Sequence, residues 1–177
     1  MHGYETIDNK EFENIKKIFK NGNGVLFRSG FEKLRGKSFQ VEQFEKKFAK
    51  KFQTKYSLAV SSGTAALRVA LAALNINKKD EVITQSFTFV ATVEAIIESG
   101  AKPVCTEIDE TLNMCPDDLI KKINKKTKAV ILVHMLGSPG KISKIKTICK
   151  RKNIPLIEDT AWGIGGKYKN KFLGTIG

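Results

Sequence analysis

From about residue 56 onward, short apolar runs alternate with segments of helical spacing. The apolar runs have the length of buried strands and cover residues 57–60, 81–84, 103–105, 129–133 and 155–157. Helical patterns follow them at residues 64–74, 91–99, 116–123 and 141–152. Strand–helix alternation with short connections predicts an α/β fold, a mostly parallel sheet with helices on both faces.

The first part of the chain has a different pattern. Residues 11–20 predict a short amphipathic helix. Residues 38–52 predict a second helix with one packing face, because four phenylalanines recur near helical spacing: Phe39, Phe44, Phe48 and Phe52. We therefore expect an irregular or helical arm over residues 1–37 and a large domain that starts at residue 38 and continues to 177.

Composition narrows the class of protein. The chain has 177 residues, of which 41% are hydrophobic, so one domain can bury a sizeable core. No apolar run approaches the roughly 20 residues of a membrane span, and no secretory signal pattern opens the chain. The cysteines, Cys105, Cys115 and Cys149, lack C-x-x-C spacing, which predicts reduced thiols with no disulfide or zinc site. We expect a cytoplasmic protein that is not attached to a membrane.

The net charge is +13, which by itself suggests a protein that binds nucleic acid. However, the chain contains 31 basic residues of which only four are arginine, and they are scattered along its whole length. The basic and aromatic residues do not interleave as they do in RNA-binding sheets. We interpret the charge as a lysine-rich solvated surface and do not expect a nucleic-acid partner.

Ser62, Gly63 and Thr64 link the first apolar run to a helix. The first amides of a helix have no internal partner and carry a positive dipole, so a phosphate fits there. Gly63 would allow a close approach of the backbone, and the two hydroxyls could add hydrogen bonds. The structural alternative is that Thr64 caps the helix while Gly63 makes the turn.

Two further candidates follow other apolar runs. Phe89 could stack on a planar ring, or it could be an ordinary core residue. Asp159 could face the nitrogen of a pyridine ring and keep it protonated, or it could be a cap or a loop charge. Because the carboxyl ends of parallel strands form one crevice, we expect these candidates to converge there.

His134 and Glu158 also end apolar runs. His134 could act as a base, although we favour a hydrogen-bonded structural histidine. Glu158 points to the side of its strand opposite Asp159, so we expect a structural role for it.

Together these segments resemble the DegT/DnrJ/StrS family of sugar aminotransferases, which are pyridoxal 5'-phosphate (PLP) enzymes. The resemblance implies the large domain of the aspartate-aminotransferase fold, fold type I. It rests on segments that occur in order from about Phe39 to the end: SSGTAAL (61–67), DEVITQSFTFVAT (80–92), GAKPV (100–104), TKAV (127–130), VHMLG (133–137), IEDTA (157–161) and LGTIG (173–177).

The resemblance implies roles for single residues. Ser62, Gly63 and Thr64 would hold the cofactor phosphate, Phe89 would stack on the ring, and Asp159 would pair with the pyridine nitrogen. Trp162 departs from the family motif, because the family often has glutamine or histidine there, near the ring oxygen.

The resemblance also implies an activity. The amino group would pass from a donor such as glutamate to a keto-sugar, most often nucleotide-linked, in polysaccharide or secondary-metabolite sugar biosynthesis, and the enzyme would be a homodimer. The Schiff-base lysine is expected beyond Gly177, so we expect an N-terminal part without a catalytic residue, truncated within the large domain and inactive alone. The alternatives are a PLP-dependent sugar dehydratase, with histidine in place of that lysine, and a non-catalytic basic protein that binds anions or nucleic acid.

Overall fold

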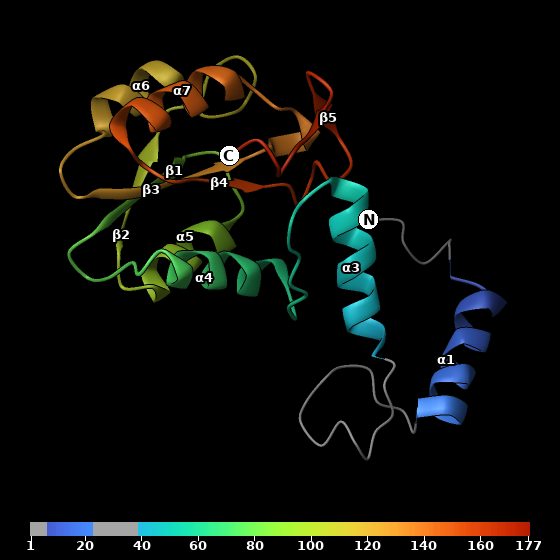
Figure 1. Ribbon diagram of the computed structural model, residues 1–177. Coiled ribbons are helices and arrows are strands. Elements are labelled where there is room, and N and C mark those ends of the chain that lie inside the picture. The colour runs from blue at the N-terminus through green and yellow to red at the C-terminus, as the bar shows by residue number, and fades with distance from the viewer. Residues whose placement is uncertain (1–6, 23–38) are drawn as a thin grey trace. The chain divides into compact units, whose positions relative to one another are not determined.

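The computed structural model describes residues 7–22 and 39–177 (Figure 1). The chain gathers into two compact units, Met1–Ala59 and Val60–Gly177. The predicted boundary between residues 37 and 38 lies outside the described residues, so it stays a prediction.

Both helices predicted for the first unit are present. They are α1 (Asn9–Gly22) and α3 (Gln40–Phe52). In α3 the rings of Phe48 and Phe52 lie 4.4 Å apart between centroids, and Phe52 is buried. Phe44 lies on the same face, with its ring centroid 5.6 Å from that of Phe48, but its side chain is exposed. The lysine and glutamate residues between the phenylalanines keep most of this helix in contact with water.

The second unit is built on a four-stranded sheet in the order β2-β1-β3-β4, and every neighbouring pair is parallel. Its strands are β1 (Glu81–Gln85), β2 (Lys102–Thr106), β3 (Thr127–Val133) and β4 (Leu156–Asp159). Each agrees with a predicted apolar run to within a few residues. The predicted parallel sheet is therefore confirmed.

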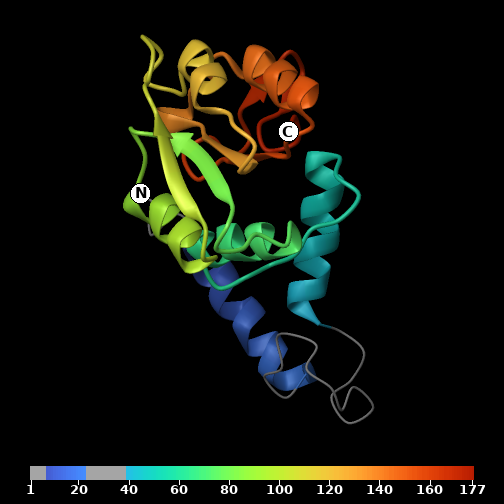
Figure 2. The same ribbon diagram turned by 90° about the vertical axis from the view of Figure 1, so that its left-hand side faces the viewer.

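Helices cover both faces of this sheet, as predicted (Figures 1 and 2). One face carries α4 (Gly63–Ala73) and α5 (Val90–Glu98), and the other carries α6 (Pro116–Lys122) and α7 (Ile142–Lys152). Side chains alternate between two cores: Ile131 joins the α4–α5 cluster, and Leu132 joins the α6–α7 cluster. Two covered faces explain why the last five residues of β3 are all buried.

Three short elements complete the unit. A 3₁₀ turn, η2 (Met135–Gly137), follows β3 directly. A small antiparallel hairpin joins β5 (Lys167–Tyr168) to β6 (Lys171–Phe172). Its two turn residues both have positive φ, as a tight two-residue hairpin turn requires.

The predicted strand at residues 57–60 is wrong: the segment has no regular structure. A strand forms only against a backbone partner, and this run pairs with no strand of the described residues. Leu58 is 67% exposed, and the amide of Ala59 binds the Glu45 carboxylate at 2.8 Å. Apolar composition alone therefore did not make a strand here.

The cysteines are free thiols, as predicted. Cys149 is buried on α7, and burial raises its pKa to about 11. Over residues 7–22 and 39–177, no helix combines the length and apolar character that crossing a bilayer requires.

Candidate active site

The carboxyl ends of β1, β3 and β4 are tied together at one edge of the sheet. Val133 stands beside Asp159 in the β3–β4 register. The side chain of Gln85, the last residue of β1, accepts a hydrogen bond from the Val133 amide at 3.3 Å. Its amide nitrogen donates to the carbonyl of Phe87 at 3.0 Å, which anchors the loop before α5. Gln85 was not among the predicted site residues, although a glutamine that ends a buried apolar run was a usable signal.

The first backbone amides of α4 have no acceptor within residues 7–22 and 39–177. Ser62 is the N-cap: its Oγ accepts from the Ala65 amide at 3.1 Å, and its carbonyl accepts from the Ala66 amide at 3.0 Å. The alternative in which Thr64 caps the helix is therefore wrong. The amides of Gly63 and Thr64 precede these first bonds and lie at the positive end of the helix dipole.

Space above Gly63 is open. A Cβ atom built on this glycine would meet no other atom within 4 Å. Steric crowding by the rest of the chain therefore does not require a glycine at this position. An anion could approach the backbone here, which fits the predicted phosphate site.

The direction of α4 determines whether its first residues lie at the amino or the carboxyl ends of the strands. Leu74, the residue after α4, lines a depression together with Thr127 and Pro155, at the amino ends of β3 and β4. An 11-residue helix is about 16 Å long, so the other end of α4 points toward the carboxyl edge. Ser62 to Thr64 thus face the same edge as Asp159.

Phe89 and Trp162 are exposed at this edge. Phe89 is the N-cap of α5 and is 67% exposed, so its interpretation as a core residue is wrong. Trp162 is 60% exposed in the turn that follows β4. That turn packs closely against η2, since a Cβ on Gly137 would lie 3.2 Å from the Trp162 carbonyl oxygen. Two large aromatic faces are therefore open to a ligand.

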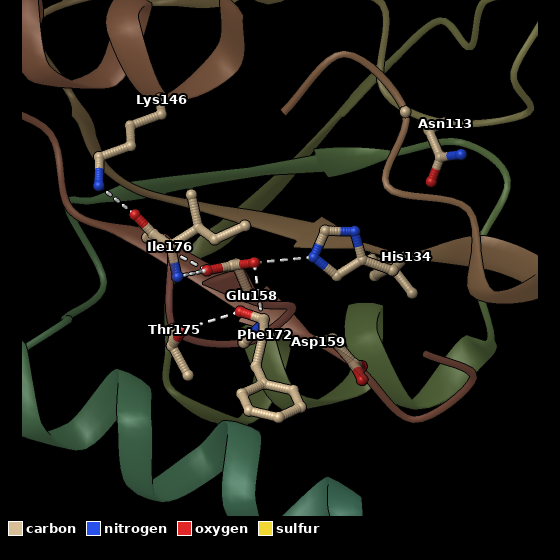
Figure 3. Close-up of polar contacts among 12 residues, drawn as sticks. Asn113, His134, Lys146, Glu158, Asp159, Phe172, Thr175 and Ile176 are labelled. Carbon is tan, nitrogen blue, oxygen red and sulfur yellow. Dashed lines mark hydrogen bonds and ion pairs between the residues drawn. The ribbon is translucent and has the colours of Figure 1, made fainter. Parts of the chain in front are cut away.

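Asp159 ends β4 and is half-buried. Its Oδ1 accepts from the Ala161 amide at 2.9 Å, which orients the carboxylate in the following turn. Figure 3 shows this carboxylate turned away from the neighbouring Glu158 carboxylate.

Glu158 and His134 form a buried pair beneath the site. Their Oε2 and Nε2 atoms lie 2.9 Å apart, and the Glu158 side chain is 2% exposed. Burial raises the pKa of Glu158, but hydrogen bonds from His134 and three backbone amides outweigh it and leave the pKa below its ordinary value. His134 is thus a hydrogen-bonded structural histidine, as favoured, and Glu158 is structural as expected.

Chemically, the edge combines unused amides, two exposed aromatic faces and a carboxylate on an α/β sheet. Known proteins share the fold. The aminotransferase from Psychrobacter cryohalolentis is similar with a TM-score of 0.84 and 32% identity, over 96% of this chain and 41% of that one. GDP-4-keto-6-deoxymannose-3-dehydratase, solved with a trapped PLP-glutamate geminal diamine, is similar with a TM-score of 0.82 and 29% identity, over 97% of this chain and 44% of that one.

In sequence, the chain is 43% identical to GDP-perosamine synthase of Escherichia coli O157:H7 over 138 residues, 77% of this chain and 38% of that protein. The signature of the DegT/DnrJ/EryC1/StrS aminotransferase family matches residues 14–177, and the chain belongs to this family. Its fold is the large-domain fold of the type I PLP aminotransferases, as predicted. The chain spans about two fifths of the length of the relatives it matches.

Proposed function

We propose that these residues form the N-terminal part of a PLP-dependent aminotransferase that acts on a nucleotide-linked keto-sugar. The observation that carries the proposal is the open start of α4, at the same edge of the sheet as Asp159 and exposed Phe89. Family membership supports it, because the relative with 43% identity is named for the synthesis of a GDP-linked amino sugar.

The residues at this edge suit the chemical groups of PLP. Ser62, Gly63 and Thr64 would bind the phosphate through the first amides of α4 and through hydroxyl groups. Phe89 would cover one face of the ring. Asp159 would hold a proton on the ring nitrogen, and Trp162 would border the ring. When bound, PLP supplies an aldehyde that accepts and returns an amino group and a ring that withdraws electrons.

The substrate class follows from the relatives. Glutamate would be the amino donor, and a sugar ketone would be the acceptor. A diphosphate-linked sugar is an anion, and the chain's net charge of +13 favours its approach. We place the reaction in the cytoplasm, in polysaccharide or secondary-metabolite sugar biosynthesis, with a homodimer as the working form. No membrane or nucleic-acid partner is proposed.

The Schiff-base lysine is expected in sequence that would follow Gly177. Residues 1–177 by themselves would then bind the cofactor without covalent attachment and would not turn over substrate. Borohydride reduction after PLP addition should give no adduct at one specific lysine. A single dominant labelled lysine would contradict this part of the proposal.

A sugar dehydratase is the second candidate. The observation in its favour is the similarity to the 3-dehydratase at a TM-score of 0.82. The two activities differ in their products, since an aminotransferase leaves an amino group on the sugar and a dehydratase leaves a deoxy-sugar. Product analysis of the longer protein, given a keto-sugar nucleotide and glutamate, separates them.

The chain contains one tryptophan, Trp162, which is a built-in reporter of the proposed site. PLP should quench its fluorescence saturably, whereas pyridoxal, which lacks the phosphate, should bind at least about tenfold more weakly. Equal binding of the two compounds would contradict the phosphate site. Tight binding of a polyanion such as heparin, without a PLP response, would favour the non-catalytic anion binder.

A further inference from the structure

The Glu158 carboxylate is completely occupied by hydrogen-bond donors. Its Oε2 accepts from His134 Nε2 at 2.9 Å and from the Gly174 amide at 3.0 Å. Its Oε1 accepts from the Ile176 amide at 2.6 Å and from the Gly177 amide. A carboxylate offers about four acceptor sites, so no site is left for a substrate or for water.

Three of these four donors belong to one turn, residues 174–177 (Figure 3). The turn begins at Gly174, whose φ of +87° favours glycine. Lys146 of α7 donates to the Ile176 carbonyl, and the Thr175 hydroxyl donates to the Phe172 carbonyl at 2.8 Å. Glu158 is therefore the side chain that fastens this turn to β4.

His134 holds both residues at the end of β4. Its backbone amide donates to the Asp159 carbonyl at 3.0 Å, while its ring binds the Glu158 carboxylate. Side chains alternate along a strand, so fixing Glu158 on one face directs Asp159 to the other. The two carboxylates in Figure 3 point apart in this way.

We propose that His134 and Glu158 are positioning residues that set the direction of the Asp159 carboxylate by clamping the end of β4 and residues 174–177. This role rests on the proposed function, since Asp159 is the cofactor-facing residue there. The side chains of His134 and Glu158 are themselves buried, so they would act on the cofactor only through Asp159.

The clamp also fixes the tautomer of His134. Its Nδ1 atom is buried and has no hydrogen-bond partner among the described residues. A proton on Nδ1 would be buried without an acceptor, whereas a proton on Nε2 points at Glu158. The ring nitrogen that bears the proton facing Glu158 is therefore Nε2.

Hydrogen exchange measured by NMR tests the clamp without any cofactor. In Glu158→Gln the side chain keeps its size but loses its charge and turns an NH₂ group toward backbone donors. The amides of β1 and β3 should report only the loss of global stability, whereas those of Gly174, Ile176 and Gly177 should exchange at least about tenfold faster by local opening. The matched control is Glu98→Gln, which removes a carboxylate from a surface ion pair with Arg68 and should leave all these rates unchanged. Unchanged rates at the three amides in Glu158→Gln would overturn the clamp.

Two measurements on the wild-type chain remain informative if a variant fails to fold. The ¹⁵N shifts of the His134 ring should report a protonated Nε2, and a bare Nε2 would overturn the clamp. The ³J couplings of Asp159 should report one χ1 rotamer, and rotamer averaging would overturn its fixed direction. In a folded Glu158→Gln the same couplings should become averaged, and a retained single rotamer would overturn the positioning role.

A double-mutant cycle on PLP affinity, read by Trp162 fluorescence, separates this inference from the proposed function. If Glu158 acts through Asp159, the variant carrying both Glu158→Gln and Asp159→Asn should bind PLP no more weakly than Asp159→Asn alone. Fully additive losses would overturn the positioning role. If the wild-type chain binds no PLP, the proposed function fails, while the exchange rates and couplings still decide the clamp.

Discussion

Glu158 and Asp159 are consecutive carboxylates at the end of one strand, yet their surroundings are opposite. Glu158 lies in the interior and meets four donors of its own chain. Asp159 is half-buried, its carboxylate accepts a hydrogen bond from the Ala161 amide only two residues away, and exposed aromatic residues follow strands at the same end of the sheet. A polar group whose hydrogen bonds are all made within the chain stabilises the fold, whereas a polar group with free hydrogen-bonding capacity suits a ligand.

Glu158→Gln should have the largest effect on stability. It removes one partner from a buried network and leaves donors facing an amide, at a cost of about 3 kcal/mol in the free energy of unfolding. Urea unfolding would measure the loss. Glu98→Gln, the surface control, should change stability by no more than about 0.5 kcal/mol. A loss below about 1 kcal/mol for Glu158→Gln would mean that the two carboxylates differ less than the structure indicates.

Asp159→Asn should leave stability almost unchanged but should strongly reduce activity. Asparagine can still accept from the Ala161 amide, so stability should stay within about 0.5 kcal/mol of wild type. In the longer protein with saturating PLP, amino transfer to a keto-sugar should fall at least about a hundredfold, because an amide cannot hold the ring nitrogen protonated. Steady-state rates would measure this loss. Near-normal rates would return Asp159 to the role of a loop charge.

The pH dependence of stability should carry a signature of Glu158. Its folded-state pKa lies below the ordinary value of 4.5, so its contribution is complete above that value and is lost as pH falls through the lower folded pKa. Urea unfolding between about pH 6 and pH 2 should therefore show a drop in wild type that is smaller in Glu158→Gln. Identical curves for the two proteins would contradict an ionised, hydrogen-bonded Glu158.

Phe89→Ala should have a moderate effect that is confined to binding. The side chain is exposed, so the free energy of unfolding should change little. Loss of stacking should weaken PLP by about 1 kcal/mol, or roughly fivefold. Quenching of Trp162 would measure the affinity. A large loss of stability in this variant would show that Phe89 packs within the fold after all.

Local sequence patterns predicted most of this fold. Strands such as β3 could be predicted from continuous apolar runs, because both faces of the sheet are covered. Helices such as α4 could be predicted from apolar residues at helical spacing. The prediction of a strand at residues 57–60 failed for a physical reason. A strand needs a backbone partner, and the local sequence does not encode that partner.

The candidate site shows the same limit. The placement of Phe89 and Asp159 at the carboxyl ends of the strands could be predicted from the parallel-sheet rule. The role of Ser62 as the cap could not be separated from that of Thr64, because both residues are good caps. The full set of donors around Glu158 could not be predicted either, since three of them come from a turn 16 to 19 residues away.

The most direct test of the account is PLP affinity in Gly63→Val. The space above Gly63 is open and its backbone is not left-handed, so a valine there should leave the free energy of unfolding nearly unchanged. The added side chain should fill the proposed phosphate position, and PLP quenching of Trp162 should weaken at least about tenfold. The matched control is Ala73→Val, at the far, exposed end of the same helix, which should bind PLP as wild type does. Wild-type PLP affinity in Gly63→Val would contradict a phosphate site at the start of α4.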